Sequence, residues 1–321
     1  EALGLYRYWG LGDYDGALEA YGKALKLKPS ASTVLYAMGN VRRRQGHWEE
    51  ALALQQRGAA LDPLNGSISF NLALTLRALR RLDESDAVLA HGLATAPDDA
   101  AMLGERLYNA QARGDLRAAH ALAEQVPLDS GDLFSISHRL LEWHYEHDDP
   151  RAVAEIKQLL EHLGTQDPGG RSNLLGMLGA IETARGAAAE GKAHLLEARK
   201  LLEALRADGD TSPYTCIGLV TINAYLGDRE AADHYAGLAA TSLANDAMSL
   251  PQVFFFQAMA KTVAGDKAGA IQLLQRAQST PVVWGALPGI MRIEPAFDPL
   301  RGDPAFERLT VDPPPSPAKA Q

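Results

Sequence analysis

Three histidines lie close together near the middle of the 321-residue chain, among carboxylates that make them candidate metal ligands. His144 and His147 are three residues apart, so on a helix they would share one face. The other candidate ligands nearby are His138, Glu142, Glu146, Asp148 and Asp149. No His-Glu-x-x-His motif accompanies them and no cysteine lies nearby, so only the spacing supports a site. We therefore predict no bound metal.

The remaining reactive residues show no catalytic arrangement. Cys216 is the single cysteine, so it cannot form an internal disulfide, and its apolar neighbours predict a buried, unreactive thiol. The chain has neither a Gly-x-x-x-x-Gly-Lys-Ser/Thr loop nor a Gly-x-Ser-x-Gly elbow. Paired carboxylates such as Asp98 and Asp99 stand where helices are expected to begin, where they serve as caps. We predict no enzymatic activity and no cofactor.

Charge and hydrophobicity exclude two further classes. Lysine and arginine total 31 against 40 aspartate and glutamate, a net charge of -9, whereas a nucleic-acid-binding surface needs an excess of positive charge. Arg42, Arg43 and Arg44 form the only dense basic run, and on a helix they point in different directions. No apolar stretch is long enough to span a membrane. We expect neither a nucleic-acid partner nor a membrane span in this fragment.

The first residues predict that the sequence is a piece of a longer protein. Glu1 begins within an apolar, helix-periodic stretch, without an initiator methionine and without a signal peptide. We expect a cytoplasmic location, or a periplasmic one if a preceding part carries an anchor.

A 34-residue period organises the first third of the chain. Pro29, Pro63 and Pro97 recur at this spacing, and a polar turn followed by a helix start precedes each of them. This order is typical of two antiparallel helices: a tight turn joins them and the proline stops the second helix. Small residues such as Gly39 and Ala51 recur where the paired helices must touch.

This pattern resembles the tetratricopeptide repeat, and the likeness is close for residues 1–97. The resemblance implies an all-α, right-handed superhelix of helical hairpins. Hairpin rhythm without the strict signature continues through residues 98–281, so we predict about eight hairpins in total. Residues 282–311 are expected to form a short C-terminal cap, and residues 312–321 a disordered tail.

The end of the chain carries a second resemblance. Residues 294–309 are short, proline-punctuated pieces similar to the ends of helical-repeat regions attached to bacterial nucleotide cyclases, serine/threonine kinases and winged-helix regulators. This likeness supports an alternative function, a sensory or regulatory module of a larger bacterial signalling protein. A cover for the last hairpin's apolar face explains the same residues structurally.

The tetratricopeptide resemblance also implies where a partner would bind. In such arrays the first helix of each hairpin lines the concave surface, and the proline register transfers the groove positions to this chain. The set is rich in aromatic side chains, asparagine and arginine, which suit an acidic or aromatic peptide. It comprises Tyr6, Trp9, Tyr36, Asn40, Arg43, Arg44, Phe70, Asn71, Arg77 and Tyr108.

The main functional hypothesis is therefore a protein-interaction scaffold that holds a peptide or protein segment in this groove. Structural packing of Tyr36 and Phe70 between hairpins is the competing interpretation of the aromatic residues. A third hypothesis is a protein that binds a small ligand or metal in the bore of the superhelix, using Trp143, His144 and His147.

Overall fold

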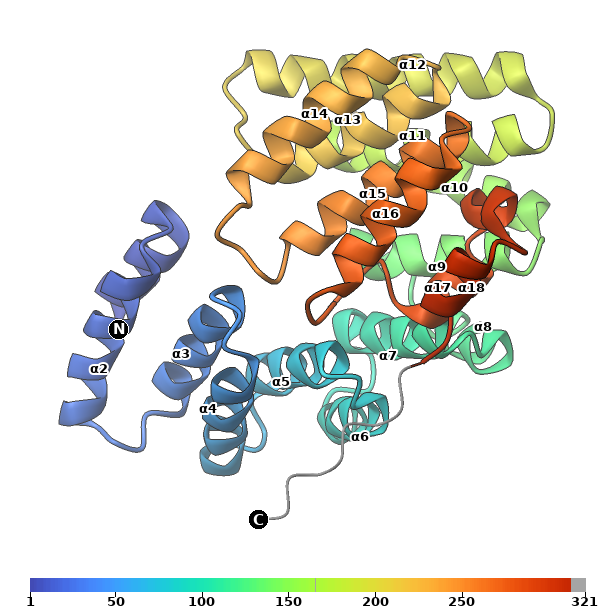
Figure 1. Cartoon of the computed structure of the whole chain (residues 1–321). Helices are drawn as coiled ribbons and strands as arrows, with labels where there is room; N and C mark the ends of the chain where they lie inside the picture. Colours follow the sequence, from blue (N-terminus) through green and yellow to red (C-terminus); the bar gives the residue numbers. More distant parts are fainter. Residues whose placement is uncertain (165, 313–321) are drawn as a thin grey trace.

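The computed structural model describes residues 1–164 and 166–312, and within them every regular element is a helix. The tail predicted from residue 312 onward lies, except for Asp312, outside the described residues. Consecutive helices pair into eight antiparallel hairpins, here called units 1 to 8 (Figure 1). The expectation of an all-α solenoid of about eight hairpins is thereby confirmed.

The first three units contain the regular repeats, and unit 4 follows them. In unit 1 the first helix is split into α1 and a π-helical turn, η1, before the second helix begins. The elements of units 1 to 4 are α1 (Ala2–Leu5), η1 (Tyr6–Gly10) and α2 (Tyr14–Leu27); α3 (Ser32–Arg44) and α4 (Trp48–Leu61); α5 (Gly66–Ala78) and α6 (Leu82–Leu93); and α7 (Ala100–Arg113) and α8 (Leu116–Ala123).

Units 5 to 8 follow, and they include the longest helix, α12. They are α9 (Leu133–Tyr145) and α10 (Asp149–Leu163); α11 (Pro168–Ala184) and α12 (Ala188–Ala207); α13 (Pro213–Tyr225) and α14 (Arg229–Ser242); and α15 (Leu250–Val263) and α16 (Lys267–Gln278). The end of the chain forms three short pieces, α17 (Pro288–Ile293), the 3-10 helix η2 (Pro295–Leu300) and α18 (Pro304–Leu309).

Tight turns join the helices of each hairpin, and the turn position needs a left-handed backbone. Gly46 has φ +82° and Gly114 has φ +73°, a region that glycine enters without steric cost. Arg80 and His147 adopt the same conformation at φ +63° and +62°, at the corresponding turns of units 3 and 5. The turn of unit 5 therefore precedes Asp149 and Pro150, which both lie in the first turn of α10.

Small side chains sit where the paired helices cross, as the repeat pattern predicts. Ala17 and Ala51 are fully buried, and a Cβ added at Gly39 would lie 2.7 Å from Gln55 Cγ. Larger residues there would separate the helices and open voids in a close-packed interior.

The solenoid curls so far that its end returns to its beginning. Helices α15 and α16 cross the interior of the arc, and α17 packs along α7 of unit 4 (Figure 1). One apolar core accordingly joins residues distant in sequence, such as Tyr108, Phe255, Leu287 and Phe297. The C-terminal pieces thus cover unit 8 and also fill space in front of unit 4.

Candidate functional site

A ladder of polar side chains connects the first helices of units 2 to 5 across the concave side. Arg43 donates to the main-chain oxygen of Asn71 at 2.9 Å, to Asn71 Oδ1 at 2.8 Å and to Thr75 Oγ1 at 3.2 Å. Arg43 is 3% exposed, so these acceptors replace water around its charge. Burial lowers the pKa of Arg43 to about 10, which leaves it charged at neutral pH.

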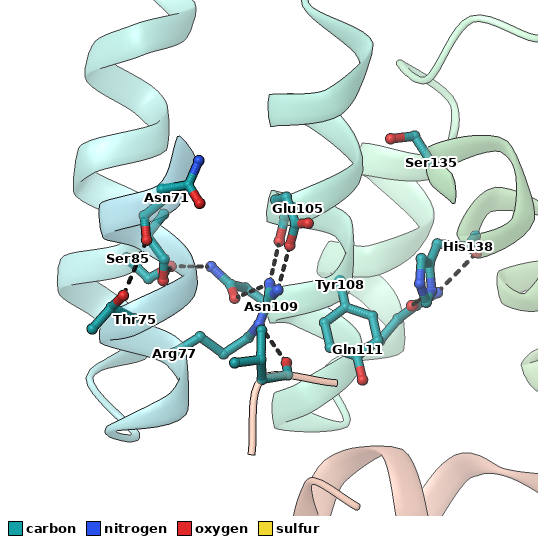
Figure 2. Close-up of polar contacts among 12 residues, drawn as sticks. Asn71, Thr75, Arg77, Ser85, Glu105, Tyr108, Asn109, Gln111, Ser135 and His138 are labelled. Carbon is teal, nitrogen blue, oxygen red and sulfur yellow. Dashed lines mark hydrogen bonds and ion pairs between the residues drawn. The ribbon is translucent and has the colours of Figure 1, made fainter. Parts of the chain in front are cut away.

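Arg77 repeats this contact one unit later, and Figure 2 shows its side chain extending toward Glu105 and Asn109. It forms an ion pair with Glu105 and donates to Asn109 Oδ1 at 3.1 Å. Arg77 and Glu105 are both fully buried. Burial raises the pKa of the Glu105 carboxyl above its usual value, although the charge of Arg77 opposes the shift.

The third rung of the ladder is an amide. Gln111 Nε2 donates to the main-chain oxygen of His138 at 3.0 Å and to Glu142 Oε2 at 2.9 Å. Arg43, Arg77 and Gln111 are each 34 residues apart, and each contacts the first helix of the following unit. These side chains hold the units in register.

The chain's own C-terminal region covers the concave side of units 3 and 4. Residues 280–287, here called the strap, run without regular structure between α16 and α17. The main-chain oxygen of Val283 accepts a hydrogen bond from Arg77 Nε at 2.9 Å, and Gly285 N donates to Tyr108 Oη at 2.6 Å. The side chains of Val283 and Leu287 are fully buried. The strap therefore occupies the groove in the way that a bound peptide would.

A second contact closes the arc at units 1 and 2. The loop between α14 and α15 meets the end of α3, where Arg44 forms an ion pair with Asp246 and donates to Tyr8 Oη at 2.6 Å. Ala247 N donates to the main-chain oxygen of Arg44 at 2.8 Å. The Arg44 guanidinium carbon also lies 5.7 Å from the ring centroid of Tyr8 and 5.3 Å from that of Trp9, within the range of a cation–π contact.

Beside this contact lies an open cleft of about 760 Å³ between units 1 and 2 on one wall and units 7 and 8 on the other. An adjoining pocket of about 370 Å³ shares Tyr14 and Arg44 with it. We call the two together the junction cleft. The charged residues that line it are Asp13, Asp15, Arg44, His47, Asp246 and Arg276, and the aromatic ones are Tyr8, Trp9, Tyr14, Tyr214 and Phe254.

The structure divides the ten residues expected in the groove into three groups. Tyr6 and Trp9 are 61% and 68% exposed. The partly buried ones are Tyr36, Arg44, Phe70 and Asn71, and the buried ones are Asn40, Arg43, Arg77 and Tyr108. The buried residues contact the protein itself: Asn40 accepts from Gln55 Nε2 at 2.8 Å, and the others belong to the ladder or to the strap contacts. Only unit 1 presents its expected groove residues openly to solvent.

Sequence reasoning missed the opposite wall of the junction cleft. Tyr214, Asp246 and Arg276 reach Tyr14 and Arg44 only because the solenoid curls back across about two hundred residues. No periodicity links these positions, so no signal in the sequence indicates their proximity. The ladder, by contrast, has a signal in the 34-residue spacing of Arg43, Arg77 and Gln111.

The candidate histidine ligands form hydrogen bonds with different partners. His144 Nδ1 lies 2.6 Å from Asp149 Oδ1, whereas His138 Nδ1 lies 3.1 Å from Gln111 Oε1. Trp143, proposed with them to line a bore, is fully buried and donates to Glu155 Oε2 at 3.0 Å. Across residues 1–164 and 166–312, no three His, Cys, Asp or Glu side chains form a group that could hold a metal.

Three further groups, two of them buried and one partly buried, have altered acidity. Burial, with a smaller effect of the Arg77 charge, lowers the pKa of His138 to about 3. Burial raises the pKa of Glu142 to about 7, although the hydrogen bond from Gln111 opposes it. Cys216 is buried, and burial raises the pKa of its thiol even though Arg206 lies at hydrogen-bond distance. None of these groups lines the junction cleft.

The fold defines an α-solenoid built from helical hairpins. Comparison with family models identifies its regular part: residues 6–46 match a model described as TPR repeat, and residues 36–100 match one described as tetratricopeptide repeat. Residues 6–100 are therefore tetratricopeptide repeats, and the later hairpins continue their solenoid. No curated protein matches the sequence closely enough to count as a relative.

Solved structures share the fold at low sequence identity. Yeast Tom70 matches 92% of this chain with 62% of its own, at 13% identity and a TM-score of 0.52. A tetratricopeptide repeat protein from Parabacteroides merdae matches 86% of this chain with 90% of its own, at 15% identity and a TM-score of 0.39. YrrB, described as a TPR protein with an unusual peptide-binding site, matches 57% of this chain with 92% of its own, at 14% identity and a TM-score of 0.41. At these identities the likeness concerns the fold alone.

Among the described residues no helix is both long and apolar enough to cross a membrane.

Proposed function

We propose that this chain is a protein-interaction scaffold that binds a peptide or protein segment in the junction cleft. Tetratricopeptide repeats in residues 6–100 support the general class. The observation that carries the location is the contrast between a groove filled by the strap at units 3 and 4 and an open cleft of about 760 Å³ at unit 1.

Exposing the concave surface of units 3 and 4 would require displacing the strap, which costs free energy. Val282, Val283, Ala286 and Leu287 are at most 1% exposed, and their apolar surface would return to water. At about 1.5 to 3 kcal/mol for each large aliphatic side chain, a peptide that displaced the strap would first have to offset this cost. The junction cleft is already open, so binding there carries no such penalty.

Exposed aromatic side chains suit the cleft to a partner segment. Trp9 and Tyr214 are 68% and 51% exposed and line the same pocket, and Tyr6 is exposed on the same helical segment as Trp9. Large, stiff aromatic side chains supply much contact area at a low cost in conformational entropy, which is why they dominate binding energy at interfaces. An aromatic or proline side chain of the partner would pack among them.

The test is a selection of binding peptides from a displayed random library on the intact chain, followed by titration of the selected peptides. Trp9→Ala and Tyr214→Ala are each expected to weaken binding at least tenfold, because a central aromatic anchor contributes about 2 kcal/mol or more. Leu27→Ala is the matched control, since Leu27 is 90% exposed at the far end of α2. Equal affinity of all three variants would refute the cleft as the binding site.

The regulatory role suggested by residues 294–309 stays a prediction. In the structure these residues form η2 and α18, whose Phe297 and Phe306 are fully buried against the core.

A further inference from the structure

Arg276 is the basic side chain of the junction cleft whose charge the protein itself leaves unneutralised. It lies in the last turn of α16, is exposed, and lines the cleft. Arg44, the other arginine there, is held by Asp246, Tyr8 and Ser249. Within the part of the chain that the structure describes, no ion pair engages Arg276. An anion from outside would therefore not have to displace an internal carboxylate from Arg276.

Stacking on an aromatic ring prepares Arg276 for such a contact. Its guanidinium carbon lies 4.0 Å from the ring centroid of Phe254, which is 5% exposed and fixed in the core. A guanidinium that lies over a ring can still present N–H donors to solvent, and these donors match the two oxygens of a carboxylate. The stacked side chain also has less rotational freedom to lose on binding.

The opposite wall of the cleft is acidic, but internal donors already satisfy it. Asp13 Oδ1 accepts the Gly16 N–H at 2.9 Å as the cap of α2, and Asp15 accepts from Gln45 Nε2 at 2.9 Å. Arg7 lies 3.8 Å from Asp13. Among the described residues, Arg276 and the exposed Asp15, whose donor Gln45 is neutral, are thus the cleft charges without an ion pair, and Arg276 is the one that attracts an acidic occupant.

We propose that the junction cleft recognises a peptide segment carrying an acidic residue close to an aromatic one, with Arg276 binding the carboxylate. The proposal rests on the proposed function and names the partner chemistry of the same site. The aromatic pocket beside the cleft argues against a simple anion, because Trp9, Tyr14 and Tyr214 offer apolar contact that a phosphate cannot use. Arg276 is the specificity-determining residue of this site.

The experiment compares peptide selections on the intact wild-type chain and on Arg276→Gln. Peptides selected on the wild type are expected to be enriched in Asp and Glu beside aromatic residues. Replacing the acid of a selected peptide by its amide is expected to weaken binding to the wild type about tenfold, or about 1.4 kcal/mol, since the charge-assisted contact with Arg276 is lost. The same replacement should change little with Arg276→Gln.

Two controls separate the outcomes. Arg185→Gln alters an exposed arginine at the end of α11, outside the cleft, and should keep the tenfold preference. Inorganic phosphate added alone should not displace a selected peptide at equal ionic strength. An unchanged acid preference in Arg276→Gln, or displacement by phosphate, would overturn the assignment to Arg276 or to a peptide. Selection of no peptide at all would defeat the proposed function as well, and circular dichroism of each variant establishes that the helices are intact.

Discussion

Equivalent positions in unit 1 and unit 3 have opposite environments. Trp9 and Arg77 are separated by two 34-residue periods and occupy the same place on their helices. Trp9 is 68% exposed beside an open cleft, whereas Arg77 is fully buried under the strap. A repeat therefore fixes where a side chain points, and the curvature of the whole solenoid decides what it meets there.

The same contrast divides the molecule into a filled and an open half of one concave surface. At units 3 and 4, buried polar contacts replace a ligand, so substitutions there should act on stability. At unit 1, the side chains face solvent, so substitutions should act on binding. The predictions below test that division, beginning with the largest effect on stability.

Arg77→Ala is expected to lower the free energy of unfolding by about 3 to 5 kcal/mol, because it leaves the buried Glu105 carboxylate without its counter-charge. Chemical denaturation followed by circular dichroism measures the change. The double variant Arg77→Met with Glu105→Leu should recover most of the loss, since it removes both charges.

Arg43→Ala provides the matched comparison. Arg43 occupies the preceding rung, yet its acceptors are the neutral groups of Asn71 and Thr75. Its removal strands no buried charge, so a loss of about 1 to 2 kcal/mol is expected. A larger loss for Arg43→Ala than for Arg77→Ala would contradict the role assigned to the Arg77–Glu105 pair.

Gly289→Ala should detach the strap end from unit 4. A Cβ at this position would lie 2.0 Å from the main-chain oxygen of Ala112 and 2.5 Å from Gly114 N, and main-chain atoms cannot move aside as side chains do. Overpacking of this kind costs about 1 to 3 kcal/mol. Thermal unfolding should show a lower midpoint, and proteolysis should cut near the strap earlier than in the wild type.

Gly237→Ala is the control for this substitution. Gly237 is exposed within α14 and its added Cβ would meet no atom within 4 Å. Higher helix propensity should stabilise this variant by up to about 1 kcal/mol. If both alanines behaved alike, close contact between α17 and α7 would not explain the effect at Gly289.

Stability between pH 7 and pH 5 should depend on His138. Burial lowers its folded pKa to about 3, so between about 6.5 and 3 the unfolded chain binds a proton that the folded chain does not. The contribution of His138 is therefore present above pH 6.5 and is lost as the pH falls. Relative to His138→Gln, the wild type should lose about 1 kcal/mol between pH 7 and pH 5, which is less than full burial implies because the ring is half-buried.

Relative to Glu142→Gln, the wild type should lose stability as the pH rises, the opposite of the trend for His138. Burial raises the folded pKa of Glu142 to about 7, so the folded state binds an extra proton between about 4.5 and 7 and loses stability as the pH rises through that window. Denaturation curves at several pH values measure both differences. Parallel curves for the wild type and His138→Gln would show that the histidine is hydrated in the folded protein.

Local patterns in the sequence predicted the hairpins well, because a turn, a small-residue crossing and a stop signal act within about 34 residues. Gly46, Ala51 and Pro63 each have a local cause. The strap contacts were beyond such reasoning. Val283 contacts Arg77, and Asp246 contacts Arg44, only because the small rotations between successive units add up to a closed arc. No local sequence pattern encodes that overall curvature.

The groove prediction failed to anticipate burial for the same reason. Arg77 and Tyr108, which the register assigns to the groove, contact Val283 and Gly285, and the register did not show that the chain itself covers them. Whether the exposed members Tyr6 and Trp9 bind a partner stays a prediction. The cleft wall that carries Tyr214 and Arg276 had no counterpart in that reasoning.

Trp9→Ala gives the smallest expected change in stability, and it tests most directly whether unit 1 differs from units 3 and 4. The substitution removes the ring contact with Tyr8, at 4.7 Å between centroids, and the contact with Arg44. It leaves no buried cavity, because the Trp9 side chain is largely exposed. A change of no more than about 0.5 kcal/mol in the free energy of unfolding is expected, as for most exposed positions. The same variant should lose peptide binding. A loss of stability comparable to that of Arg77→Ala would instead mean that Trp9 holds the arc closed, and the open half of the concave surface would then be structural like the filled half.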